Sequence, residues 1–244
     1  MGERADSFLD GRVKVEQPPS GFRSGTDAVL LAAAVPAREG ETLLEPGSGA
    51  GVASLCVAAR IPRCRIVGVE IGAGLVSLAN ENSRRNRMAA RISFICADVF
   101  DLPRGCRRSF DHVFLNPPFH GNEGMRSSSR ERARALHDEG RLKDWLEASF
   151  KRVSAGGTLT AIIRSDRLDE AFQALPARGM VVFPLWPRAN EPAKRVILQI
   201  RKNARAPFAL LAGLALHDAT GRYTPDAEDV LRGRTSLALA TPRR

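Results

Sequence analysis

The chain has 244 residues, with 37 Lys and Arg against 27 Asp and Glu, which gives a formal net charge of +10. This length supports one sizeable domain with a complete hydrophobic core, and an apolar content of 43% is ordinary for a globular protein. No run approaches the ~18 consecutive apolar residues of a membrane span, and the charged N-terminus is unlike a secretory signal, so we expect a cytoplasmic protein with no membrane partner.

The four cysteines show neither a CxxC pair nor a histidine spacing that suits a metal ion. They are Cys56, Cys64, Cys96 and Cys106. We therefore expect reduced thiols, most of them in the core, and no bound metal.

The first predicted helix covers the apolar stretch 28–35 and follows the segment Gly25-Thr26-Asp27. Thr26 or Asp27 is a plausible N-cap, because a side-chain oxygen at that position accepts a hydrogen bond from a free backbone N–H group. Contact with a ligand is an equally good interpretation of the same residues. If this helix packs beside the glycine-rich loop that follows, Asp27 would meet the ligand of that loop.

A glycine-rich loop, Glu45-Pro46-Gly47-Ser48-Gly49-Ala50-Gly51, joins the apolar segment 41–44 to a helical pattern over 52–60. Its alternate glycines allow a tight turn and let a ligand approach the backbone closely. The spacing is GxGxG rather than the GxGxxG of dinucleotide sites, and the leading acid would repel a phosphate and suit a cationic amine. The alternative is a ligand-free turn in which Glu45 is a solvated loop acid.

Two acidic residues follow the next two predicted strands. Glu70 ends the strand 65–69, about 20 residues past the loop, where a carboxylate can accept hydrogen bonds from ribose hydroxyls. Asp98 follows the strand 92–96, and the carboxyl end of a strand in an open α/β sheet faces the ligand crevice. A helix cap is the alternative role for Asp98.

The motif Asn116-Pro117-Pro118-Phe119 stands at the end of a short apolar strand predicted over 111–115. Proline fixes φ and has no backbone donor, so the chain leaves the sheet in one stiff direction. That stiffness would hold the Asn116 carboxamide and nearby carbonyls as a fixed set of acceptors beside an aromatic face. Such a set suits a planar amino group during alkylation, whereas a plain turn explains Asn-Pro-Pro equally well on local grounds.

Basic residues form three runs, at 84–87, at 104–108 and at 126–134. The third run directly follows Phe119, so it would lie at the mouth of the pocket that this motif forms. Any single run is commonly a solvated face, but three runs and the overall charge favour a polyanionic substrate such as a nucleic acid.

Strand and helix patterns alternate from about residue 41 to residue 178, which is typical of a parallel sheet with helices on both faces. Helices are also predicted near 72–86, 142–153 and 167–178, and a turn at Gly156-Gly157 leads into a strand near 158–163. The segments 180–185 and 195–200 have no helix between them and predict an antiparallel pair at one sheet edge.

The predicted fold class is therefore α/β and Rossmann-like, with a mostly parallel seven-stranded sheet, an antiparallel edge pair and helices on both faces. We expect one domain, made of an N-terminal extension (1–40), a catalytic core (41–201) and a C-terminal extension (202–244).

These motifs resemble class I S-adenosylmethionine-dependent methyltransferases that act on amino groups. The resemblance rests on the acid-led glycine loop, on Glu70, on Ala97-Asp98 and on the Asn-Pro-Pro-Phe motif. More narrowly, the chain resembles the bacterial tRNA adenine-N6 methyltransferases that modify valine tRNA beside the anticodon. The narrower resemblance rests on these segments: 25–31, the asparagines Asn80, Asn82 and Asn86, and the late stretches 189–196 and 221–224.

The resemblance implies S-adenosyl-L-methionine as the cofactor and tRNA as the partner. Cofactor binding is assigned to Thr26, Asp27, Glu45, Gly47, Gly49, Gly51, Glu70, Asp98 and Asn116. Catalysis is assigned to Asn116, Pro117, Pro118 and Phe119. Substrate contact is assigned to Phe119, His120, Arg126, Arg130, Arg132 and Arg134, although His120 is also explained as a solvated loop histidine.

The implied reaction uses two fixed acceptors. The Asn116 side-chain oxygen and the Pro117 carbonyl would each accept one N–H of an adenine amino group, which aims the nitrogen lone pair at the sulfonium methyl. Phe119 would stack on a base that has been extruded from its neighbours. We expect this reaction at N6 of an adenosine next to the anticodon.

Three other functions stay open. A release-factor glutamine methyltransferase uses the same motif on a carboxamide, but those enzymes usually carry an N-terminal helical domain that forty residues cannot supply. A ribosomal RNA guanine amino-methyltransferase is a nearer alternative. A non-catalytic RNA-binding protein would explain the charge but not the ordered series of acid, glycines, acid and asparagine.

Overall fold

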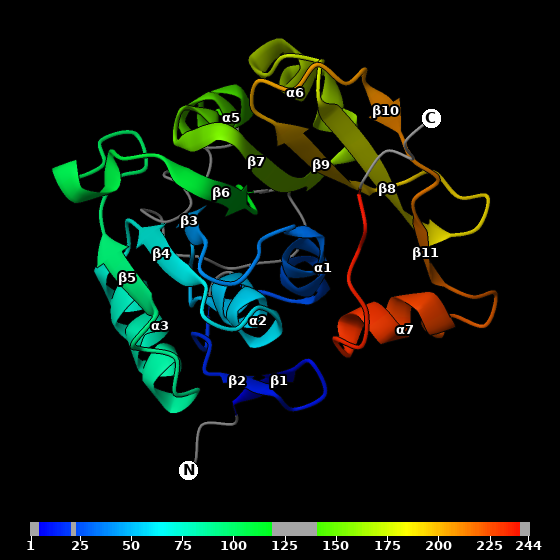
Figure 1. Ribbon diagram of the computed structural model, residues 1–244. Coiled ribbons are helices and arrows are strands. Elements are labelled where there is room, and N and C mark those ends of the chain that lie inside the picture. Colours follow the sequence, from blue (N-terminus) through cyan, green and yellow to red (C-terminus); the bar gives the residue numbers. More distant parts are fainter. Residues whose placement is uncertain (1–4, 21–22, 119–140, 240–244) are drawn as a thin grey trace.

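The computed structural model describes residues 5–20, 23–118 and 141–239, and Figure 1 shows their arrangement. Within these ranges a nine-stranded sheet forms the centre, and a separate hairpin of β1 (Asp6–Phe8) and β2 (Val13–Val15) lies below it in the view. The central strands follow the order β10-β8-β9-β7-β6-β3-β4-β5, and β11 also pairs with β8. No helix in the described ranges is long and apolar enough to cross a membrane.

All seven predicted strands are present in the sheet. They are β3 (Thr42–Pro46), β4 (Arg65–Glu70), β5 (Ile92–Cys96), β6 (Phe110–Leu115), β7 (Val153–Arg164), β8 (Met180–Arg188) and β9 (Arg195–Arg201). The pairs among β3, β4, β5, β6 and β7 are parallel, while β9 runs antiparallel to both β7 and β8. The α/β fold class is confirmed, and so is the pairing of 180–185 with 195–200.

The expected count of seven strands is too low. Two short strands, β10 (Ala209–Leu210) and β11 (Leu214–His217), run parallel to β8 on its outer side, so the antiparallel pair does not close that edge by itself. Strands of two and four residues are too short to show an alternating pattern in the sequence. The C-terminal extension therefore contributes strands to the same sheet as the core.

The expected turn at Gly156-Gly157 is also wrong, because both residues lie inside β7. The pairing register of β7 with β6 shifts between Phe110 and His112, which marks a bulge in β7. A Cβ on Gly157 would lie 2.2 Å from the carbonyl oxygen of Asp111, so the close approach of the two strands requires glycine there. The glycine pair bends a strand rather than ending one.

Helices cover both faces of the sheet, as expected. They are α1 (Thr26–Ala34), α2 (Val52–Arg60), α3 (Ala73–Arg85), α5 (Leu142–Lys151), α6 (Leu168–Ala174) and α7 (Pro225–Leu231). In Figure 1, α1, α2, α3 and α7 lie on one side and α5 and α6 on the other. Helix α6 ends earlier than the predicted residue 178 because Leu175 precedes a proline and is extended.

Alternate residues of the central strands belong to two separate hydrophobic core clusters. Leu43 and Phe114 pack with α1 and α2, whereas Leu44 and Leu115 pack with α5, and all four are fully buried. Strands that are buried on both faces appear as nearly continuous apolar runs, which is why they could be found in the sequence.

The N-terminal hairpin is tied to α3 by two asparagine side chains. Asn86 hydrogen-bonds the backbone N–H and C=O of Lys14, and Asn82 does the same with Glu16. Asn82, which is fully buried, also donates from Nδ2 to the carbonyl oxygen of Ala50 at 3.0 Å. Of the three asparagines that carried the narrower resemblance, Asn82 thus connects the N-terminal segment to the glycine loop.

Candidate functional site

The parallel strands bring most of the predicted cofactor residues to one edge of the sheet. The glycine loop follows β3, Glu70 ends β4, Asp98 follows β5 and Asn116 follows β6. These four strands are neighbours in the order β6-β3-β4-β5 and run parallel. Their carboxyl ends therefore share one edge, where open α/β sheets bind ligands.

The glycine loop is anchored to the end of β4. The backbone N–H groups of Gly47 and Ser48 both donate to the carbonyl oxygen of Val69, at 2.8 and 3.0 Å. Gly51 has φ of +86°, and a Cβ there would lie 2.6 Å from the Phe94 ring. Gly49 also has positive φ, but a Cβ on it would meet open space, so a ligand can approach the loop at Gly49.

Glu70 contacts the glycine loop through one carboxylate oxygen and the turn after β4 through the other. Oε2 accepts from the N–H of Gly49 at 3.1 Å, and Oε1 accepts from the N–H of Gly72 at 2.9 Å. The side chain is only partly buried, at the same edge as Gly49. Its assignment to ribose hydroxyls stays a prediction, and the structure adds a second task, which is to hold the loop in shape.

Glu45 is buried, with 3% of its surface exposed, so the alternative of a solvated loop acid is wrong. Its Oε2 accepts from both the N–H of Ser54, at 3.1 Å, and the hydroxyl of the same residue. Ser54 lies in the first turn of α2, where an acidic group interacts favourably with the helix dipole. Burial nevertheless raises the pKa of Glu45 to about 8, with the Ser54 hydrogen bonds opposing that shift.

Asp98 is exposed and accepts a hydrogen bond from the N–H of Phe100 at 2.8 Å. The residues after it form a turn and not a helix, so the helix-cap alternative is wrong. An exposed carboxylate beside the glycine-loop edge remains free to bind a ligand through its second oxygen, which is a prediction that no contact in the structure tests.

The segment before α1 differs from the expected cap. The N-cap residue is Gly25, with no side-chain hydrogen bond, and Thr26 is already helical. The Asp27 carboxylate accepts from Nε of Arg195 at 3.3 Å. The cation that faces Asp27 in the structure is therefore part of the chain itself.

Asn116 carries the most informative polar atom of this edge. Its Oδ1 is buried and has no hydrogen-bond partner among the described residues, and the following Pro117 is buried. Buried polar atoms are almost always hydrogen-bonded, so an unpaired one next to a ligand edge marks a group that is reserved for a donor. The other predicted substrate residues, Phe119, His120, Arg126, Arg130, Arg132 and Arg134, lie outside the described residues.

An aromatic cluster supports the loop from the opposite face of the sheet. A Cβ on Gly47 would lie 3.2 Å from the indole of Trp145 on α5, so the two are in close contact. Trp145 packs edge-on against Phe100 at 5.7 Å between ring centroids, and the Arg141 guanidinium lies 3.8 Å from the Phe100 ring centre. Sequence reasoning missed Trp145, because a single aromatic on a helix has no signal that distinguishes it from ordinary core.

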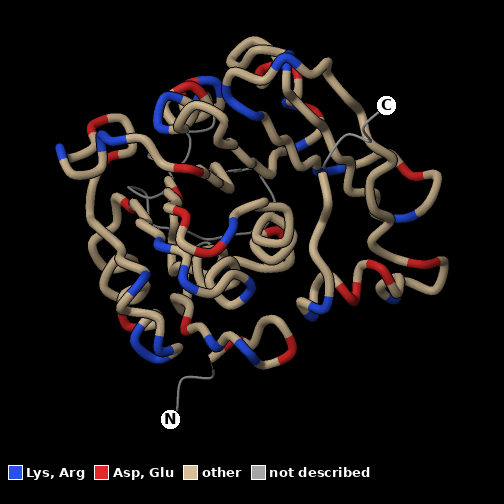
Figure 2. Tube along the Cα trace, in the orientation of Figure 1, with Lys and Arg blue, Asp and Glu red and all other residues tan. Residues whose placement is uncertain are grey.

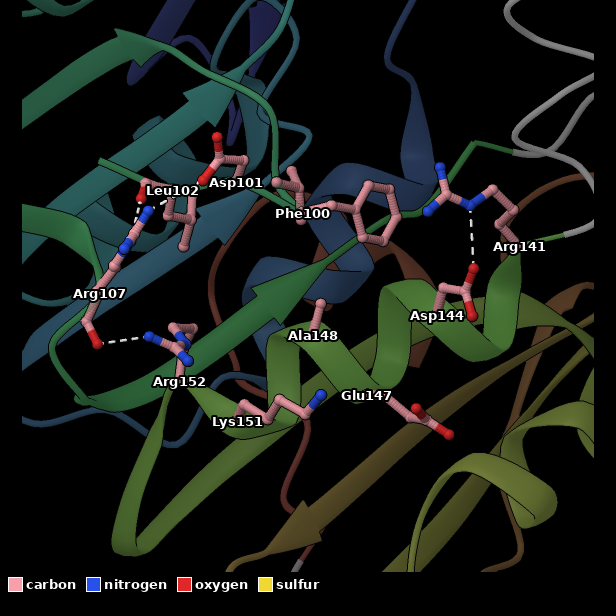
Figure 3. Close-up of a pocket in the computed structure, with 11 residues that line it drawn as sticks. Phe100, Asp101, Leu102, Arg107, Arg141, Asp144, Glu147, Ala148, Lys151 and Arg152 are labelled. Carbon is pink, nitrogen blue, oxygen red and sulfur yellow. Dashed lines mark hydrogen bonds and ion pairs between the residues drawn. The ribbon is translucent and has the colours of Figure 1, made fainter. Parts of the chain in front are cut away.

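A hollow of about 410 Å³ lies beside this cluster, between the loop after β5 and helix α5, as Figure 3 shows. Charged residues of both signs line it, and most are paired with each other: Arg141 with Asp144, and Arg107 with Asp101. Arg152 donates to the carbonyl oxygen of Arg107 across its lower rim. The hollow adjoins the predicted adenine side of the cleft but is not lined by the glycine loop.

The structure does not bring the two described basic runs to this edge. Arg84 and Arg85 end α3, which returns to the amino edge of the sheet, and both pair with Glu81. Arg107 and Arg108 come just before β6 begins, again at the amino edge. In Figure 2 basic and acidic residues are interspersed over the described part of the chain.

Known proteins resemble this chain over most of its length. The family model of the methyltransferase small domain matches residues 22–154. A tRNA1(Val) (adenine(37)-N6)-methyltransferase from Shewanella woodyi is 33% identical over 167 residues, covering 66% of this chain and 68% of that protein. The protein of the same name from Porphyromonas gingivalis is 27% identical over 243 residues, covering 91% of each. The crystal structure of a predicted O-methyltransferase from Agrobacterium tumefaciens superposes with a TM-score of 0.72 and 26% identity, covering 87% of this chain and 98% of that one.

Proposed function

The chain belongs to the methyltransferase small domain family, and from that premise we propose that it transfers the methyl group of S-adenosyl-L-methionine to N6 of an adenine next to the anticodon in tRNA. The observation that carries the proposal is the buried Oδ1 of Asn116, which has no hydrogen-bond partner among the described residues and lies at the edge that also holds the glycine loop. A buried acceptor is suited to a neutral amino group.

The residues at the edge fit the cofactor. Gly49 leaves space in which the ligand can approach the backbone of the loop. Glu45 and Asp27 offer carboxyl groups for the ammonium of the cofactor. Glu70 and Asp98 would hold its ribose and its adenine. The buried Ser48 hydroxyl also has no partner among the described residues and lies within the same loop. When bound, the cofactor supplies an electrophilic methyl group on a positively charged sulfur.

The protein's share of the reaction is positioning. Adenine N6 is a poor nucleophile because its lone pair is delocalised into the ring. The Asn116 oxygen and the Pro117 carbonyl would each accept one of its two N–H bonds, which favours a tetrahedral nitrogen whose lone pair points to the methyl donor. The amine becomes acidic only as the methyl transfers, so no strong base is required, and a neutral carboxamide is sufficient.

The relatives' names support tRNA as the substrate, and the net charge of +10 fits a polyanion. A cytoplasmic location follows from that substrate. The test is a methyl-transfer assay with tritiated cofactor and, separately, bulk tRNA, ribosomal RNA and a release factor, followed by nucleoside analysis. We expect label in N6-methyladenosine from tRNA. Label on a ribose or phenolic hydroxyl would instead favour O-methylation, and label in guanosine or glutamine would favour the other amino-group acceptors.

A further inference from the structure

A second surface hollow lies at the carboxyl edge, beyond the candidate active site. It has a volume of about 590 Å³ and lies between the turn that joins β8 to β9 and the segment that joins β10 to β11. Its lining is Trp186, Ala189, Asn190, Glu191, Pro192, Ala212, Gly213 and Ala215. This region includes the late stretch 189–196 of the sequence, to which the proposed reaction assigns no task.

The aromatic member of the lining is fixed in orientation. Nε1 of Trp186 donates to the carbonyl oxygen of Ala212 at 2.9 Å. A Cβ on Gly213 would lie 2.7 Å from Nε1 of Trp186 and 2.3 Å from the carbonyl oxygen of Pro184, so only glycine allows the β10–β11 segment to approach so closely. The indole is therefore a rigid plane and not a mobile surface side chain.

Trp186 is half-buried, and the other lining residues add hydrogen-bonding groups. Three of them are alanines, whose side chains are single methyl groups and so project little into the hollow. Asn190 is exposed and has φ of +67°, which places it at the tip of the turn. A carboxamide beside an aromatic plane can bind the edge of a planar heterocycle while the plane stacks on its face.

An aromatic pair and two arginines lie next to this hollow. His217 lies beside Arg188 in the β11–β8 register, two residues along from Ala215 beside Trp186. The His217 ring stacks on Tyr223, with 4.8 Å between centroids, and Tyr223 is 41% exposed. The side chains of Arg188 and Arg222 are 50% and 81% exposed, and they pair with Glu191 and Asp218, respectively.

We infer that this hollow is a stacking site for an unpaired base of the RNA substrate, with Trp186 as its platform, Asn190 as its hydrogen-bonding group and Tyr223 as a flanking platform. The inference rests on the proposed function. Strands β8 and β6 are separated by three strand spacings, or roughly 14 Å. That distance exceeds one stacking step of ~3.4 Å, so the base bound here is a different base from the adenine presented to Asn116. RNA loops are recognised in this way, through splayed bases that stack on aromatic side chains.

The experiment uses the full chain and an RNA hairpin with a valine-tRNA anticodon loop. Binding is followed by quenching of tryptophan fluorescence, which reports stacking on an indole. We expect Trp186→Ala to weaken hairpin binding about tenfold, the usual effect of removing one stacking platform. Trp186→Phe should retain most of the affinity while losing the quenching, a result that a merely structural role for the indole does not produce.

Matched controls separate stacking from general charge or folding effects. Tyr223 and Phe208 are each 41% exposed, but Phe208 lies just before β10, whose residues pair with the start of β8 at the opposite edge of the sheet. Tyr223→Ala should raise the KM for tRNA several-fold with kcat nearly unchanged, while Phe208→Ala should alter neither. Asn190→Ala, a change at an exposed turn, covers the case in which Trp186→Ala fails to fold.

The outcomes distinguish this inference from the proposed function. If the wild type methylates tRNA but all variants bind and turn over like it, the stacking site is wrong and the proposed function stands. If the wild type neither binds the hairpin nor methylates tRNA, both are wrong. Unchanged quenching in Trp186→Phe would also overturn the assignment, because it would place the RNA against Trp145 instead.

Discussion

Nε of Arg195, at the start of β9, donates to the carboxylate of Asp27, near the start of α1, across 168 residues of sequence. The two side chains are each about one-third exposed, so solvent screens the pair. A double-mutant cycle with Asp27→Asn and Arg195→Gln should give a coupling free energy of unfolding of at most ~1 kcal/mol. Urea unfolding measures it. A coupling of several kcal/mol would mean that the pair holds the N-terminal segment in place.

Replacing Asn116 should separate activity from stability. Asn116→Ala is expected to lower kcat by roughly 10²–10³, because the acceptor of the amine is lost. The same change should leave the free energy of unfolding nearly unchanged or higher, since the deleted oxygen is buried without a partner among the described residues. Binding of S-adenosylhomocysteine, measured by calorimetry, should persist.

Asn82→Ala is the matched control for that prediction. Asn82 is fully buried, and its carboxamide makes three hydrogen bonds to backbone groups. Its removal should lower the free energy of unfolding by roughly 1–3 kcal/mol. Similar stability losses in both variants would show that the Asn116 oxygen is paired in solution.

The buried Glu45 should make stability depend on pH. Its pKa of about 8 in the folded state exceeds that of an unfolded glutamate, so the folded state binds the proton more tightly. The free energy of unfolding should therefore fall by up to roughly 1.4 kcal/mol per pH unit between about pH 4.5 and pH 8, and level off above. Glu45→Gln should remove that slope, as unfolding titrations at several pH values would reveal. A wild-type slope equal to the variant's would contradict the buried, protonated carboxyl.

Cofactor binding should release a proton if Glu45 meets the ligand's ammonium. A nearby cation favours the ionised carboxylate and lowers its pKa. Calorimetric titrations with S-adenosylhomocysteine near pH 7, in buffers of different ionisation enthalpy, should then show release of a fraction of a proton per ligand. Glu45→Gln should abolish the buffer dependence. Equal release by wild type and variant would assign the proton to another group.

Alanine substitutions at two glycines of the loop should differ in their effects on stability and on cofactor binding. Gly51→Ala places a methyl group 2.6 Å from the Phe94 ring at a positive φ, so it should destabilise the fold strongly. Gly49→Ala meets open space and should cost only the ~1–2 kcal/mol of a left-handed backbone, yet weaken cofactor binding. Thermal unfolding and ligand calorimetry, run on both variants, check the pair. Undiminished affinity in Gly49→Ala would place the ligand elsewhere.

Much of the fold could be predicted because strands buried on both faces leave continuous apolar runs, as in 111–115 and 195–200. The convergence of Glu70, Asp98 and Asn116 on one edge follows from the parallel order of their strands. Contacts that depend on three-dimensional packing could not be predicted. They are the hydrogen bonds from Ser54 to Glu45, the contact between Trp145 and Gly47, and the ion pair between Asp27 and Arg195. The strand β10 is only two residues long and has no periodic signal.

The three hydrogen bonds of Asn82 have a consequence for the order in which the cleft is built during synthesis. The segment around Glu16 and the turn at Ala50 are both made before residue 82, yet the backbone carbonyl of each accepts a hydrogen bond from the Asn82 side chain. A nascent chain that ends ahead of α3 therefore contains every glycine of the loop but lacks the side chain that joins loop to hairpin. The glycine loop is therefore joined to the N-terminal hairpin only after the ribosome has added residue 82, more than thirty residues past Ala50.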